Sequence, residues 1–237
     1  MNVAYLCDRG LEREENEDSI LVDERENFYL VADGMGGHQK GSVASAMVVD
    51  AFRGTASFMN KEVAKSLGEK LVKAILEEQL NTQVEKATQM LKAYAGTHVI
   101  LDVMGSTLVG IYKVPHLNKW AIFYLGDSRL YHFSATRLTQ LTLDHTSVGN
   151  TSSVISKAVG NFDAMPVELN YISANKGDLF LLCSDGVSDY CHNEELLNLV
   201  LKYRSSLPLL AQYIKEFVYE RGAKDNLSLV LVEVEGA

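Results

Sequence analysis

The chain has few cysteines, and none of them shows a paired spacing. Its 237 residues include three cysteines, Cys7, Cys183 and Cys191, and no CxxC motif. The odd number and the wide spacing argue against a disulfide framework and against a zinc ribbon. Cys183 lies inside an apolar run, which predicts an ordinary core position for its side chain.

Long hydrophobic runs are also missing. No apolar stretch approaches the roughly 18 residues that a membrane-spanning helix needs. The N-terminal segment MNVAYLCD lacks the basic start and the long apolar centre of a signal peptide. We therefore expect a cytoplasmic protein that makes no membrane contact.

Positive charge is scarce. Lysine and arginine number 22 against 31 aspartates and glutamates, so the formal net charge is −9. This balance argues against a nucleic-acid-binding protein, which needs a basic face. Many of the acids crowd into residues 12–26, which is typical either of a solvated surface or of a site that attracts cations.

The chain shows no linker, repeat or low-complexity segment, so we expect one domain over residues 1–237. Strands come in runs and helices come in pairs, which indicates an α+β fold and not the alternation of a parallel doubly wound sheet. Helices are predicted over 42–58, within 61–95, from Asn193 and from near Ser206. Strands are predicted at 3–7, 19–22, 28–32, 106–113, 120–125, 129–133, 167–172, 179–183 and 227–234.

Several acids lie where predicted strands begin or end. An Asp-Gly pair after a strand is most often a simple turn, so each position alone is weak evidence. Four or five carboxylates gathered at one rim would repel one another unless cations were present, and oxygen ligands suit Mg²⁺ or Mn²⁺. The acids concerned are Glu17, Asp18, Asp33, Asp127, Asp185 and Asp225.

A pair of hard cations has a known chemical use. Two such ions can hold a bridging water and clamp phosphoryl oxygens during in-line attack. An arginine would help to bind the remaining phosphate oxygens, and Arg13 is the candidate, although its position also fits an exposed loop residue. The six histidines show no HxxxH spacing, so zinc fits less well and most of them are expected at the surface or in packing roles.

Six short motifs in this order resemble the metal-dependent protein phosphatase (type 2C) family, and the bacterial single-domain branch is the most similar. The resemblance implies a four-layer α-β-β-α sandwich, in which two antiparallel sheets are flanked by helix pairs and the metals lie between the sheets at one end. The motifs are DRGLEREENED at 8–18, DGMGGH at 33–38, GST at 105–107, GDSR at 126–129, SDG at 184–186 and DN at 225–226.

The resemblance also implies roles for individual residues. Asp33 would bridge two Mn²⁺ or Mg²⁺ ions, and the Gly34 carbonyl would bind one of them. Asp185 and Asp225 would complete the second ion's ligands. A metal-bound water would then attack the phosphorus directly, with no phosphoenzyme. The remaining implied roles belong to Glu17 (a first-ion ligand through water), Asp18 (behind the ligands), Arg13 (phosphate binding) and Asp127 (with Asp185, a weaker third metal site).

Two departures from the family pattern stand out. The flap near 146–154 is cut to a short stretch of Ser, Gly, Asn and Thr, which we expect to be mobile, and Lys157 replaces the usual arginine. Met35 stands where some members carry a histidine that is proposed as the acid for the leaving group. Protonation would then fall to a metal-bound water or to His38, and the sequence does not choose between them.

The main hypothesis is a metal-dependent protein serine/threonine phosphatase. Its expected partners are phosphorylated proteins, in opposition to a bacterial Ser/Thr kinase, and we expect a monomer. Two alternatives stay open: a regulatory module that keeps the fold with little turnover, which the short flap favours, and a small-molecule phosphatase, which an open cleft would permit.

Overall fold

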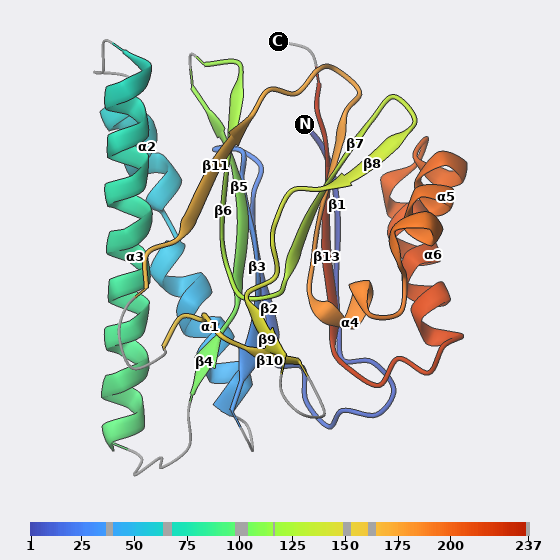
Figure 1. Ribbon diagram of the computed structural model, residues 1–237, viewed down its shortest axis with the longest axis horizontal. Coiled ribbons are helices and arrows are strands. Elements are labelled where there is room, and N and C mark those ends of the chain that lie inside the picture. The colour runs from blue at the N-terminus through green and yellow to red at the C-terminus, as the bar shows by residue number, and fades with distance from the viewer. Residues whose placement is uncertain are drawn as a thin grey trace.

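Two antiparallel β-sheets face each other, and helices cover both outer faces (Figure 1). The computed structural model describes residues 1–36, 40–63, 68–97, 104–115, 117–148, 153–160 and 165–235. The predicted α+β sandwich is confirmed. Among the described residues, no helix has both the length and the apolar character that a membrane crossing requires.

The first sheet has the strand order β11-β6-β5-β3-β2, and the short β4 pairs with β3. β3 is buried throughout Phe28–Ala32 because one face meets helices and the other meets the second sheet, so its sequence does not alternate. The strands are β2 (Asp18–Asp23), β3 (Phe28–Met35), β4 (Gly105–Ser106), β5 (Leu108–Val114), β6 (Lys119–Leu125) and β11 (Glu168–Ile172).

The second sheet has the order β1-β13-β12-β7-β8, so the first and last strands of the chain lie side by side. Its central strands β12 and β13 are apolar and almost wholly buried. The strands are β1 (Asn2–Asp8), β7 (Arg129–Ser134), β8 (Arg137–Gln140), β12 (Leu179–Cys183) and β13 (Leu227–Glu233). β8 was not predicted, because its four residues are polar or half-exposed at a sheet edge.

Three helices pack on the first sheet where a pair was expected: α1 (Lys40–Phe52), α2 (Thr55–Val63) and α3 (Glu69–Thr97). The single helix predicted over 42–58 is wrong, because the chain turns at Gly54, whose φ of +81° favours glycine. The helix predicted from residue 61 is also wrong at its start: residues 61–63 belong to α2, and α3 begins at Glu69.

The other sheet carries α5 (Asn193–Tyr203) and α6 (Leu207–Tyr219), which begin as predicted. The one-turn α4 (Asp185–Ser188) was missed because four residues carry no helical period. The buried side chains form three clusters: one under each helical layer and one between the sheets. Cys183 lies in the cluster beneath α5 and α6, as predicted.

The ends of the shortened flap are ordered into a small hairpin. β9 (Thr146–Val148) pairs with β10 (Ser153–Ile155) in antiparallel register. Neither strand was predicted, since three-residue strands are too short to show a period. The mobility predicted for this segment falls on residues 149–152, which lie outside the described residues.

Candidate active site

Acids from both sheets meet at one end of the sandwich, the lower end in Figure 1, where α4 lies. Asp18 and Asp33 are register partners across β2 and β3. Asp185 begins α4, with one residue between it and the end of β12, and its charge raises the pKa of Asp33. Asp225 precedes β13 and lies close enough to raise the pKa of Asp185. Residues as far apart in sequence as 18 and 225 therefore form one cluster.

The backbone of Asp33 is held in place by Thr107. The Asp33 amide donates to Thr107 Oγ1 at 2.9 Å, and the Thr107 amide donates to the Asp33 carbonyl at 2.8 Å. Thr107 Oγ1 also lies 2.7 Å from Ser128 Oγ. Thr107 is the last residue of the GST motif at 105–107, but the sequence predicted no role for its side chain. In the structure, Thr107 fixes the backbone of Asp33 near the end of β3, and with it the position of the Asp33 carboxylate.

Asp18 is buried beside its register partner Asp33, and its carboxylate accepts a hydrogen bond from the Ser184 hydroxyl. Ser184 Oγ donates to Asp18 Oδ2 at 2.8 Å and accepts from the Ser228 amide at 3.0 Å. Asp18 is only 6% exposed, and its second oxygen, Oδ1, has no hydrogen-bond partner among the described residues. Ser184 and Ser228 are further residues that sequence reasoning did not single out.

The acidic segment before β2 is anchored by one asparagine. Asn226 Nδ2 donates to the carbonyls of Arg9 and Glu15, each at 2.8 Å, and Asn226 Oδ1 accepts from the Glu17 amide at 2.8 Å. Because Asn226 follows Asp225, the same turn sets both the Asp225 carboxylate and the path of this segment. In the sequence, only the adjacent Asp225-Asn226 pair could have indicated that Asn226 anchors this segment.

Arg13 projects from this segment toward the acids. Its Nη2 lies 2.7 Å from Asp225 Oδ2, and its Nη1 lies 3.8 Å from Glu17 Oε2. Burial alone would lower the pKa of Arg13, but Asp225 and Glu17 outweigh it and raise the pKa. The side chain is 47% exposed, so the guanidinium lies at the rim of the cluster with one edge in solvent.

Two glycines bring backbone and carboxylate oxygens together. The Gly34 amide donates to the Glu17 carbonyl at 3.1 Å, and the Gly41 amide donates to Glu17 Oε1 at 3.2 Å. A β-carbon on Gly41 would lie 2.5 Å from Glu17 Oε1 and 2.7 Å from the Gly34 carbonyl oxygen. Only glycine at position 41 leaves room for both oxygens, and the sequence analysis overlooked it.

Asp127 is placed by the turn that carries the chain from the first sheet to the second. Gly126 has a φ of +110°, and its amide donates to His145 Nδ1 at 3.1 Å while the His145 amide donates back to the Gly126 carbonyl at 2.9 Å. Arg129 holds Asp144, the neighbour of His145, with its Nη2 at 2.7 Å from Oδ2. His145 is therefore a buried positioning residue, in line with the packing role expected for most histidines.

Burial and mutual repulsion make these acids hard to ionise. Burial, followed by the charges of Asp18 and Asp185, holds the pKa of Asp33 well above its usual range. Burial raises the pKa of Asp185, to which Asp225 adds. Burial likewise raises the pKa of Asp18 to about 7 and that of Asp127 to about 6. A bound cation would remove this penalty.

The oxygens on offer fit a hard divalent cation. Within the part of the chain that the structure describes, Asp18 Oδ1 and Asp185 Oδ1 are buried without hydrogen-bond partners, and carboxylate and carbonyl oxygens are what Mg²⁺ and Mn²⁺ prefer. In the described part of the chain, no three His, Cys, Asp or Glu side chains are already arranged around one point that could hold an ion. Arg13 engages Asp225, so a cation that uses the same oxygen must displace it.

The sequence also singled out His38, Met35 and Lys157. His38 lies outside the described residues. Met35 ends β3 and pairs in register with Gly105. Lys157 binds Glu168 of β11 at 2.8 Å, so this side chain ties the base of the flap to the first sheet.

Comparison with known proteins agrees with this arrangement. Residues 12–231 match the sequence profile of the family described as Protein phosphatase 2C. The serine/threonine phosphatase stp of Listeria welshimeri is 29% identical over 256 residues, which cover 98% of this chain and 96% of that protein.

Solved structures of this class match as well. The crystal structure of the Mycobacterium tuberculosis serine/threonine phosphatase PstP/Ppp superimposes with a TM-score of 0.84 at 28% identity and covers 99% of both chains. The catalytic domain of PstP in complex with two manganese ions superimposes with a TM-score of 0.82 at 28% identity, covering 99% of this chain and 98% of the other.

An α-β-β-α sandwich with a carboxylate cluster between its sheets defines a metal-dependent phosphatase fold. This chain belongs to the protein phosphatase 2C family. The sequence-based assignment to the serine/threonine protein phosphatases, and with it to the hydrolases, is confirmed.

Proposed function

We propose that this protein hydrolyses phosphoserine and phosphothreonine in proteins, using two Mn²⁺ or Mg²⁺ ions and a weaker third. It would act as a monomer with one catalytic domain over residues 1–237, in the cytoplasm of a bacterium, and oppose a Ser/Thr kinase. The observation that supports this most is the meeting of Asp18, Asp33, Asp185 and Asp225 from two sheets at one rim.

The proposed ligands follow from these positions. Asp33 lies between Asp18 on its own sheet and Asp185 on the other, which suits it to bridge two ions. The Gly34 carbonyl and Glu17 Oε1, which share the space beside Gly41, would serve one ion, with Glu17 acting through water. The remaining proposed positions are Asp185 and Asp225 for the other ion, Asp127 with Asp185 for the third, and Asp18 behind Asp33.

The bound ions would lower the pKa of a water molecule and draw charge from the phosphate oxygens. The protein's own part is to hold these groups rigidly. Thr107 and Ser184 restrain Asp33 and Asp18, so the bridging position varies little between turnovers. The leaving oxygen would take its proton from a metal-bound water or from His38.

Arg13 would bind the phosphate. In the structure its guanidinium neutralises Asp225, and a cation at Asp225 would release it to face the substrate. A guanidinium can hold two phosphate oxygens at once through parallel N–H donors. Its half-exposed position at the rim suits contact with a phosphate that enters from solvent.

The deciding experiment measures hydrolysis of a phosphothreonine peptide and of an aryl phosphate, each with Mn²⁺ and with EDTA. We expect Mn²⁺-dependent release of phosphate from both. Equal rates in Mn²⁺ and EDTA, or rates no higher than those of an Asp185→Asn variant, would refute the enzyme and favour the regulatory module. Activity on the aryl phosphate with none on any phosphopeptide would favour a small-molecule substrate.

Replacing Arg13 with alanine is expected to raise KM for the phosphopeptide by about 10- to 100-fold, the equivalent of losing hydrogen bonds to a charged group. kcat should change much less, because Arg13 would contact the phosphate before and during the reaction alike. Steady-state kinetics at saturating Mn²⁺ checks this. Arg53→Ala, at an exposed position directly after α1, is the matched control, and an Arg13 variant with wild-type KM and kcat would contradict the role.

Replacing Gly41 with alanine is expected to lower kcat/KM by about 10-fold or more, because the new methyl group meets Glu17 Oε1 and the Gly34 carbonyl. The apparent Mn²⁺ affinity should fall with it. Gly96→Ala is the control, since no atom of the described residues lies within 4 Å of a β-carbon there. If Gly41→Ala binds Mn²⁺ and turns over like the wild type, the space beside Gly41 has no part in the site.

A further inference from the structure

A cavity of about 690 Å³ opens at the other end of the sandwich from the acids. It is lined by the turn before β3, the turn between β5 and β6, the segment before β12, and the end of β13. Asn27 at its edge directly precedes β3, whereas Asp33 lies near the end of that strand. The two residues are six positions apart along the strand, so the cavity is roughly 20 Å from the carboxylate cluster.

The cavity is lined by three basic and two acidic side chains. Arg25, Lys113 and Lys176 line it, and within the described ranges none of the three forms an ion pair. The two acids on the wall are already engaged: Glu26 accepts from the Asn60 amide, and Glu235 binds the N-terminal ammonium at 2.8 Å. Lys176 lies near enough to Glu235 to help lower the pKa of that acid. The Asn60 amide is neutral and leaves the charge of Glu26 in place, next to Arg25 in the chain, so Lys113 is the cation that remains available to an anion.

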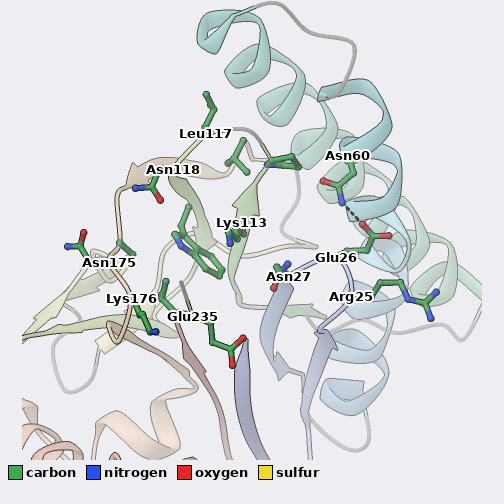
Figure 2. A pocket seen from close by; sticks show the side chains of 15 residues that line it. Arg25, Glu26, Asn27, Asn60, Lys113, Leu117, Asn118, Asn175, Lys176 and Glu235 are labelled. Atoms are coloured by element: carbon green, nitrogen blue, oxygen red, sulfur yellow. Dashed lines mark hydrogen bonds between the residues drawn. The ribbon is translucent and has the colours of Figure 1, made fainter. Parts of the chain in front are cut away.

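Lys113 is the most suitably placed of these cations. It is half-buried on β5, where its side chain is only partly open to solvent, so a charge-assisted contact there is stronger than one at an exposed lysine. Figure 2 shows Asn27, Lys113 and Lys176, which come from separate segments, around the same hollow. Asparagine amides at the rim can donate to or accept from a polar ligand.

The floor of the cavity is apolar. Trp120 and Val234 line it and belong to the cluster of side chains buried between the sheets. Trp120 packs on Phe180 with ring centroids 5.2 Å apart, so its position is well defined. The volume of the cavity is within the range that holds a small organic molecule, and its lining combines these apolar side chains with charged and amide groups.

We propose that this cavity binds a small organic anion, in which a phosphate or carboxylate group contacts Lys113 and an attached ring lies against the apolar floor. The site is separate from the phosphatase centre and does not depend on it, because its lining shares no residue with the carboxylate cluster. The strands β3, β5 and β6 run from one site to the other and join them through a single sheet.

The test uses Trp120, which is the one tryptophan of the chain. Its indole N–H resonance in the ¹⁵N-labelled full chain reports on the cavity directly. We would titrate two ring-bearing anions, AMP and benzoate, beside their uncharged counterparts adenosine and benzamide. The protein is first stripped of metal with EDTA, which is then removed by dialysis into metal-free buffer, so that neither a metal nor the chelator competes for the anions.

We expect saturable shifts with at least one anion and weaker or no shifts with its uncharged counterpart. Lys113→Gln should raise Kd about 10-fold, the equivalent of one lost charge-assisted contact. Lys86→Gln, on the exposed face of α3, and Arg13→Ala should leave Kd unchanged. Two outcomes would overturn the proposal: no saturable shift with either anion at millimolar concentration, or equal shifts in the wild type and in folded Lys113→Gln.

Discussion

Replacing Asp33 with asparagine is expected to lower kcat/KM about a thousandfold or more and, at the same time, to make the metal-free protein more stable. The loss of activity follows because an amide cannot serve as a charged bridge between two cations, whose contribution amounts to several kcal/mol. The gain in stability follows because Asp33 is forced against Asp18 and Asp185, and its removal relieves that repulsion.

The substitution preserves the local contacts. Asparagine has nearly the same shape as aspartate, and its amide can donate to Asp185, the carboxylate whose charge raises the pKa of Asp33. The backbone contacts to Thr107 involve no side-chain atom of Asp33. We therefore expect the fold to persist and the free energy of unfolding to rise by about 1–2 kcal/mol, the usual size of a stabilising change.

Thermal unfolding in EDTA and phosphopeptide hydrolysis in Mn²⁺ check the two halves separately. A rise of roughly 2–4 °C in Tm per kcal/mol is expected for a chain of this size. Asp50→Asn, at an exposed position in α1, is the control and should alter neither quantity much. Near-normal turnover would remove Asp33 from the site, and a lowered Tm in EDTA would show that the cluster is not under repulsion.

The second large expected effect concerns pH: the metal-free protein should lose stability as the pH rises, and Mn²⁺ should offset that loss. For an acid with a raised folded-state pKa, the folded state binds more protons than the unfolded state between the two pKa values. Stability from such a group is complete below the unfolded value and is lost as the pH rises through the folded value. Asp18 at about 7 and Asp127 at about 6 place this loss between about pH 4 and pH 7.

In EDTA we therefore expect a lower Tm at pH 7 than at pH 5. Mn²⁺ binds the ionised carboxylates, so its stabilisation should be larger at pH 7. At a concentration 100 times Kd, one ion adds about 2.7 kcal/mol, or roughly 5–10 °C in Tm. Calorimetric scans at both pH values, with and without Mn²⁺, measure the two effects. A Tm that rises from pH 5 to pH 7 in EDTA would contradict the expected loss, and one unmoved by Mn²⁺ would count against the metal site.

Much of the fold was predictable because its signals are local. The strands β12 and β13 consist largely of apolar residues over five and seven positions. The acids in the first turn of α5 and the proline in the first turn of α6 mark where these helices begin. Predictions failed where the local signal is short or mixed, as at the turn around Gly54 and in β8, β9 and β10. The acids themselves could be selected because each adjoins a strand.

The sequence by itself determined which residue types stand at the ends of strands, and therefore that several acids would lie at sheet edges. It did not determine which of them would touch. That Asp33 meets Asp185, that Asn226 holds the segment of Glu17, and that Gly41 leaves space for two oxygens depend on how two sheets pack. The cavity beside Lys113 is likewise assembled from segments far apart in the chain. Secondary-structure preferences act over a few residues, whereas these contacts join residues up to 209 positions apart, and only the packed tertiary structure sets those distances.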